Sequence, residues 1–112
     1  LGELVYGLRS LDDGYIPPLF DPDKIDGKIK VRARESIMWT RELLQREGIF
    51  AGISAGAVLW VAQRVAERLS TEGAGGDVVC LLPDGGWKYL STEAWTQDID
   101  TAESQVEETL WW

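Results

Sequence analysis

The sequence of 112 residues contains no histidine and a single cysteine. Without histidine, the chain itself cannot form a serine–histidine triad, a cysteine–histidine pair or a histidine-ligated metal site. The one cysteine, Cys80, excludes an internal disulfide framework and is typical of a reducing compartment, so we expect a cytoplasmic protein. Cys80 lies in the apolar run VVCLL, which favours a buried structural thiol over a nucleophile.

Long apolar runs and clusters of basic residues are also missing. No run approaches the ~20 residues that a membrane span needs, and no signal peptide is visible. The formal net charge is -8, with 19 acidic against 11 basic residues. A nucleic-acid or anionic membrane surface needs clustered Lys and Arg, so we expect neither as a partner. Because the chain starts at Leu1 and its only methionine is Met38, we expect a piece of a longer protein.

What is present is an alternation of strand-like and helix-like patterns. The run VVCLLP lacks alternation, as expected for a strand buried on both faces of a parallel sheet. Gly48 follows a helical apolar stripe and predicts the end of that helix. This order of elements predicts an α/β fold. The predicted elements are a loop over residues 1–23, strands over 28–33 and 78–83, and helices over 35–47 and 55–69.

Two glycine-rich segments lie where ligands gather in open α/β sheets, beside strand ends and helix starts. They are Gly52–Gly56, within AGISAG, and Pro83–Gly86, with the sequence PDGG. Ser54 is the lone hydroxyl in the first of them. It has two interpretations: an N-cap of the following helix, or a ligand contact where small residues let a cofactor approach the backbone. The residues alone leave both open.

The segment REGIFAGISAGAVL, followed by VVCLLPDGGWKYLST, resembles the C-terminal part of the cysteine synthase family. These are fold-type II enzymes that depend on pyridoxal 5'-phosphate (PLP). The resemblance covers essentially the whole chain, and LVYGLRSLDDGYIPPLFDP with the chain end LWW is most similar to O-phosphoserine-dependent members. It implies that residues 1–112 form a C-terminal segment of a three-layer α/β/α fold. Its largely parallel sheet would be incomplete in this chain.

The resemblance also implies a cofactor site. Ser54 matches the serine that hydrogen-bonds the pyridine nitrogen, and Gly52, Pro83 and Asp84 then lie beside the ring. A neutral hydroxyl permits an unprotonated ring, which suffices to eliminate a good leaving group. The family's second hydroxyl position is Ala55 here. An ordinary turn aspartate is the simpler interpretation of Asp84.

Substrate contacts are implied at Arg9 and its neighbour Ser10. A planar guanidinium holds phosphate through paired charged hydrogen bonds, which acetate does not need. The alternative is a solvent-facing loop arginine, paired with Asp12 or Asp13. The chain end is expected to fold back, either as a lid that excludes water from the active site or into an ordinary apolar groove or a dimer interface. The lid residues would be Leu110, Trp111 and Trp112.

The implied activity of the intact enzyme is β-replacement on O-phosphoserine, or on O-acetylserine, to give L-cysteine. The sulfur donor would be a carrier protein ending in a thiocarboxylate, or sulfide, and the intact enzyme is expected to be a homodimer. The family's Schiff-base lysine lies upstream, so this segment alone should be inactive, and Lys88 is not that residue. Two alternatives remain: a non-catalytic α/β binding module, or another fold-type II enzyme such as a cystathionine β-synthase or a threonine dehydratase.

Overall fold

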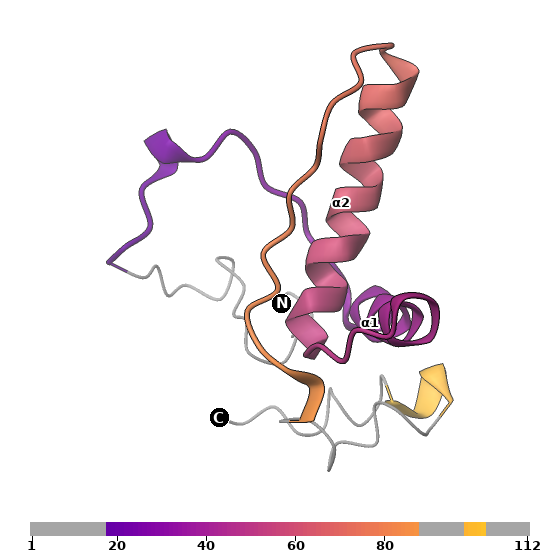
Figure 1. Ribbon diagram of the computed structural model, residues 1–112. Helices are drawn as coiled ribbons and strands as arrows, with labels where there is room; N and C mark the ends of the chain where they lie inside the picture. The colour runs from indigo at the N-terminus through magenta and orange to yellow at the C-terminus, as the bar shows by residue number, and fades with distance from the viewer. Residues whose placement is uncertain (1–17, 88–97, 103–112) are drawn as a thin grey trace.

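The computed structural model describes residues 18–87 and 98–102 of the chain. Two helices dominate this part: α1, Ala33–Glu47, and α2, Ile53–Thr71. A short 3-10 helix, η2, Pro22–Lys24, precedes them, and residues 99–102 are helical. Figure 1 looks along α1 while α2 stands upright, so the two helices cross steeply, with α1 at the foot of α2.

Both predicted helices are present and extend slightly beyond their predicted bounds. Gly48 ends α1 in the left-handed conformation, with φ of 69°, and its N–H donates to the Leu44 carbonyl at 3.0 Å. A residue without Cβ adopts this conformation without strain, so the predicted helix end is confirmed. Ala33 belongs to α1 and not to the predicted strand 28–33, and α2 begins at Ile53 and ends at Thr71.

The two helices approach closely because small residues lie at their crossing. A Cβ added at Gly56 in α2 would overlap the Ser36 carbonyl oxygen and Thr40 Oγ1 of α1. Only the first turns of α2 are fully buried, and the rest of the helix is partly exposed. The buried apolar residues form two clusters: Ala33, Ile37, Ile53, Ala57 and Ala102, with Val31 and Ile99 against them, and Leu43, Ala51 and Ala55, with Leu59 and Leu82 against them.

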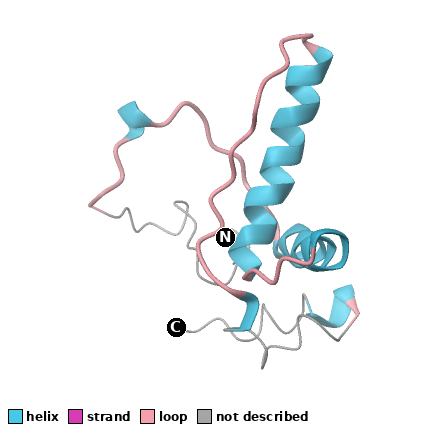
Figure 2. Cartoon of the chain, in the orientation of Figure 1, coloured by secondary structure: helices cyan, strands magenta, loops and turns pink. Residues whose placement is uncertain are grey.

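The two predicted strands are wrong for the described residues. Neither 28–33 nor 78–83 forms a strand there, and the sole β-type pairing in this part is an isolated antiparallel bridge between Ala51 and Gly85. Residues 74–83 instead return as extended chain along α2 (Figure 2). A strand exists only in a ladder with a neighbour, and the residues described provide no ladder for either segment.

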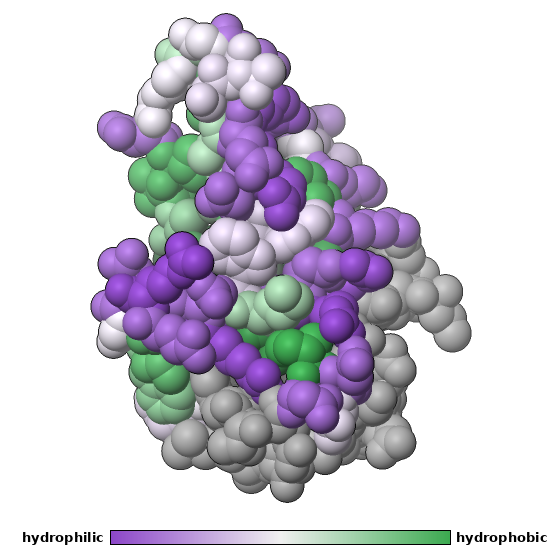
Figure 3. Space-filling view, turned by 90° about the vertical axis from the view of Figure 1, so that its right-hand side faces the viewer, coloured by the Kyte–Doolittle hydropathy of each residue, from purple (hydrophilic) through white to green (hydrophobic). Residues whose placement is uncertain are grey.

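The run VVCLLP is also less buried than predicted. Val79 is 92% exposed and Leu81 79% exposed, whereas Leu82 packs against the second cluster. Cys80, predicted to be buried, is a partly exposed free thiol. The segment therefore has one face toward its own helices and an apolar face toward solvent. On the face seen in Figure 3, apolar patches lie between charged side chains.

Candidate functional site

The two glycine-rich segments lie side by side. The Gly52 N–H donates to the Asp84 carbonyl at 3.0 Å, and the Gly86 N–H donates to the Phe50 carbonyl at 3.0 Å. These two hydrogen bonds flank the Ala51–Gly85 bridge. The sequence predicts two separate ligand-binding positions. In the structure the two segments instead form one backbone junction at the start of α2, which we call the glycine junction.

Glycine is required at this junction because the backbones approach too closely for a side chain. A Cβ added at Gly86 would lie 2.6 Å and 2.7 Å from two carbons of the Phe50 ring and 2.8 Å from the Ala51 carbonyl oxygen. Such distances are shorter than carbon atoms tolerate without movement of the neighbours. Gly86 is buried, which agrees with this close contact. The junction is therefore a tightly packed part of the chain.

Ser54 lies in the first turn of α2 and is 3% exposed. The N-cap of α2 is Gly52, with φ of -76° and ψ of 175°, and no side-chain hydrogen bond caps the helix. The N-cap interpretation of Ser54 is therefore wrong, because Ser54 lies inside the helix and its hydroxyl is not used as a cap. Its hydroxyl therefore has no capping role and lies at the buried start of α2.

The start of α2 is electrostatically suited to a neutral or electron-rich ligand atom. The free N–H groups of a helix N-terminus carry a partial positive charge. No acidic residue lies in the first turn of α2 to offset this charge. Ser54 thus presents a neutral hydroxyl at the positive end of a helix. That arrangement disfavours protonation of a basic nitrogen placed against it.

Two of the perturbed titratable groups, Glu35 and Asp98, lie at other helix starts and are explained by local hydrogen bonds, and the third, Arg41, lies within α1. A hydrogen bond from the Arg32 side chain lowers the pKa of Glu35 in the first turn of α1. The Thr101 N–H donates to Asp98 at 2.7 Å and lowers the pKa of that carboxyl. Burial lowers the pKa of Arg41, which Asp98 partly offsets. None of these groups belongs to the glycine junction, so their shifts do not indicate acid–base chemistry there.

The structure brings together some of the predicted site residues. Gly52 and Ser54 are buried, Asp84 is half-buried and Pro83 is exposed, all at or beside the junction. Their roles toward a cofactor stay predictions. The other predicted positions lie outside the described residues: Arg9, Ser10, Lys88, Leu110, Trp111 and Trp112.

Thr40 lies within the predicted helix 35–47, and the sequence gives no prediction of its polar contacts. Thr40 is fully buried, and its hydroxyl donates to the Ser36 carbonyl at 2.7 Å. It also lies 3.4 Å from the carbonyl oxygens of Gly52 and Ile53, at the start of α2. A threonine on the buried side of a helix is the sequence signal, but its contacts with α2 depend on how the helices cross.

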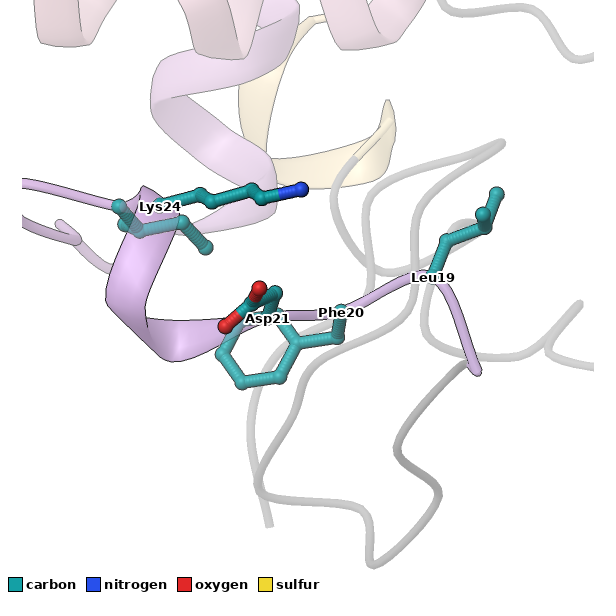
Figure 4. Close-up of a pocket in the computed structure, with 5 residues that line it drawn as sticks. Leu19, Phe20, Asp21 and Lys24 are labelled. Carbon is teal, nitrogen blue, oxygen red and sulfur yellow. The ribbon is translucent and has the colours of Figure 1, made fainter.

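Other kinds of site are not found in the described part of the chain. No group of three or more His, Cys, Asp or Glu side chains there could hold a metal ion. None of the helices described is both long and apolar enough to cross a bilayer. An open pocket of about 350 Å³ lies around Leu19, Phe20, Asp21, Lys24 and Ile25 (Figure 4), and none of these residues belongs to the glycine junction.

Curated relatives similar to this chain carry the name cysteine synthase. "Cysteine synthase" of Aquifex aeolicus is 38% identical over 88 residues, which are 79% of this chain and 27% of that protein. "Probable cysteine synthase" of Bacillus subtilis is 40% identical over 89 residues, 80% of this chain and 28% of that protein. The chain thus spans little more than a quarter of the length of these relatives. No protein-family model matches the chain.

A solved structure has a similar fold. The crystal structure of cysteine synthase (OASS) from Entamoeba histolytica aligns with a TM-score of 0.72 and 23% sequence identity. The alignment covers 94% of this chain and 31% of that one. This confirms the expected fold class, that of part of a fold-type II enzyme, even though the residues described here contain helices and no strand. By sequence and by fold, the chain belongs to the cysteine synthase family.

Proposed function

We propose that this chain forms the side of a PLP site that faces the pyridine nitrogen, as the C-terminal segment of a cysteine synthase. Its family consists of PLP-dependent enzymes of cysteine biosynthesis. The observation that carries the proposal is Ser54: a small hydroxyl residue, 3% exposed, in the first turn of α2, at the positive end of that helix and two residues after the Gly52–Asp84 backbone hydrogen bond.

The residues present fit the cofactor's ring. When bound, PLP supplies an electron-accepting ring that helps a leaving group depart from the substrate's β-carbon. The Ser54 hydroxyl contacts the ring nitrogen without protonating it, and the N-terminus of α2 disfavours a proton there. Gly52 offers backbone without a side chain, and Pro83 and Asp84 line the same edge.

The substrate contacts proposed lie in the loop that carries Arg9 and Ser10. The Arg9 guanidinium holds the phosphate of O-phosphoserine through paired charged hydrogen bonds, and Ser10 adds a hydroxyl. The intact protein then replaces that phosphate, or the acetate of O-acetylserine, with sulfur to give L-cysteine. Sulfide or a carrier protein ending in a thiocarboxylate supplies the sulfur. Leu110, Trp111 and Trp112 close over the site and keep water out.

A larger domain must complete this site. The chain spans 27–28% of its curated relatives and exposes the apolar side chains of Val79 and Leu81. Exposed apolar faces of this kind mark surfaces that meet other protein. The lysine that binds PLP covalently would come from outside this chain, Lys88 does not replace it, and the segment alone is inactive. The completed enzyme is a cytoplasmic homodimer.

The test is to purify the protein that carries this chain, load it with PLP and sulfide, and assay L-cysteine from O-phosphoserine and from O-acetylserine. Arg9→Leu should lower kcat/KM for O-phosphoserine by roughly 10- to 150-fold, the cost of one charged hydrogen bond, and leave O-acetylserine nearly unaffected. Absence of cysteine from both substrates, with sulfide and also with a thiocarboxylate-ending carrier protein as the sulfur donor, would overturn the proposed function. Equal losses for both would mean that Arg9 supports its loop and does not bind phosphate.

A further inference from the structure

The Thr40 hydroxyl lies among three carbonyl oxygens from two different helices. It donates to Ser36 O, one turn back in α1, at 2.7 Å. The carbonyl oxygens of Gly52 and Ile53 each lie 3.4 Å away and are alternative acceptors for the same proton. Thr40 is fully buried, so water cannot substitute for this hydroxyl from the surface. The contact joins the middle of α1 to the first turn of α2.

The two carbonyls of α2 belong to the backbone that precedes Ser54. Ile53 O is part of the peptide bond that joins Ile53 to Ser54, and Gly52 O accepts the Ala55 N–H at 3.1 Å. The Ile53 carbonyl lies in the peptide plane that precedes Ser54, and the Gly52 carbonyl lies in the plane before that one. Displacement of these carbonyls changes the backbone at Ser54 and therefore the direction of the Ser54 side chain. Gly56 packs directly against Thr40 on the following turn, so the first turn of α2 has little freedom to compensate.

We propose that Thr40 is a positioning residue for Ser54. Its hydroxyl holds the carbonyls of Gly52 and Ile53 so that the Ser54 hydroxyl keeps one direction toward the ligand. The proposal deepens the proposed function and rests on it, because Ser54 is there the contact to the PLP nitrogen. A displacement well under 1 Å is enough to weaken a hydrogen bond whose donor and acceptor must be aligned.

Two substitutions at Thr40 separate the hydroxyl from the shape of the side chain. Thr40→Val keeps the branched shape and puts a methyl group where three carbonyl oxygens converge. Thr40→Ser keeps the hydroxyl and removes the methyl group. Thr71 is the matched control, because its hydroxyl donates to the Glu67 carbonyl at 2.9 Å, also one turn back in a helix, but at the exposed end of α2. Thr71→Val also removes a hydrogen bond from a threonine hydroxyl to a helix carbonyl, but at the opposite end of α2 from Ser54.

The experiment uses the protein that carries this chain and has two measurements. Without PLP, amide hydrogen exchange of Ala55 reports the order of the first turn of α2. With PLP, titration gives its dissociation constant. Thr40→Val should accelerate Ala55 exchange and raise the PLP dissociation constant by roughly 2- to 10-fold, the value of one hydrogen bond. Thr40→Ser should restore both, and Thr71→Val should change neither.

A double-mutant cycle tests whether Thr40 acts through Ser54. In a Ser54→Ala background, Thr40→Val should add no further loss of PLP affinity. The same added loss in both backgrounds, or unchanged Ala55 exchange in Thr40→Val, would overturn the positioning role. If Ser54→Ala leaves PLP affinity unchanged while Thr40→Val still accelerates exchange, the proposed function fails but Thr40 still orders the first turn of α2.

Discussion

At the scale of single residues, the α1–α2 crossing holds two hydroxyls with opposite energetic roles. Thr40 Oγ1 is fully satisfied by carbonyl oxygens. Ser36 Oγ is equally buried but has no hydrogen-bond partner among the residues that the structure describes. A buried hydroxyl without a partner costs stability, whereas a satisfied one contributes to it. The close approach of Gly56 is to the Ser36 backbone carbonyl and not to its hydroxyl.

Ser36→Ala should therefore stabilise the protein. The substitution removes the unsatisfied hydroxyl and keeps the Cβ, so the free energy of unfolding should rise by about 1 kcal/mol. Denaturant unfolding of the variant and the wild type gives this difference. Thr40→Ala is the contrasting variant, which should lower the free energy of unfolding. A loss of stability in Ser36→Ala would mean that this hydroxyl has a partner after all.

At the scale of elements, the helices follow from local sequence and the strands do not. Gly48 and the apolar spacing of residues 37–44 are sufficient to predict α1, because capping and helix periodicity are local. Residues 78–83 have a strand-like sequence, but a strand also needs a ladder neighbour. The same limit applies to the site. The two glycine segments are recognisable in sequence, but their backbone bridge and the contacts of Thr40 arise only from packing.

Gly56→Ala should force the helices apart. The new Cβ would overlap Ser36 O and Thr40 Oγ1 of α1. Overpacking of this kind costs about 1–3 kcal/mol of stability. Gly27→Ala is the control, because a Cβ there meets nothing within 4 Å. Thermal unfolding of both variants tests the crossing, and equal melting temperatures would contradict the packing described.

The start of α1 should make a pH-dependent contribution through Glu35. The Arg32 side chain lowers the pKa of Glu35 from its ordinary value of 4.5, with Arg32 Nε donating to Oε2 at 3.1 Å. A carboxyl whose pKa is lowered by folding stabilises the folded state above its unfolded pKa. That contribution is lost as the pH falls below 4.5 and through the lower folded pKa.

Glu35→Gln isolates this contribution. At pH 7 the variant should be less stable by about 0.2–1 kcal/mol, the range for a partly exposed ion pair. The difference from the wild type should shrink as the pH falls below about 4.5, because the wild-type carboxylate becomes protonated. Urea unfolding of both proteins between pH 7 and below about 4.5 measures this difference in the free energy of unfolding. A difference that stays constant with pH would exclude the Arg32 contact as its source.

At the scale of the whole molecule, the extended segment 78–83 has one side that packs against the rest of the chain and one side that faces solvent. Leu82 packs against Leu43, Ala51 and Ala55, whereas Leu81 is 79% exposed. The outward face is apolar, and the chain spans little more than a quarter of the length of its relatives. The helices of this chain thus bury only one side of segment 78–83, whereas its sequence predicts a strand buried on both faces.

Adjacent leucines test this division directly. Leu82→Ala should lower the free energy of unfolding of the chain by about 2 kcal/mol, because the side chain contributes to a buried cluster. Leu81→Ala should change it by less than about 0.5 kcal/mol, because the side chain is already in water. The comparison requires only denaturant unfolding of the chain itself. If Leu81→Ala were as destabilising as Leu82→Ala, the outward face would be covered within this chain.

The most direct test of the central claim is the nitrogen-15 chemical shift of PLP labelled at its pyridine nitrogen, bound to the protein that carries this chain. With Ser54 in place, the shift should be that of an unprotonated nitrogen that accepts a hydrogen bond. In Ser54→Ala it should move toward that of a free, unbonded pyridine nitrogen. The same shift in both proteins, or the shift of a protonated ring in the wild type, would contradict the assignment of Ser54.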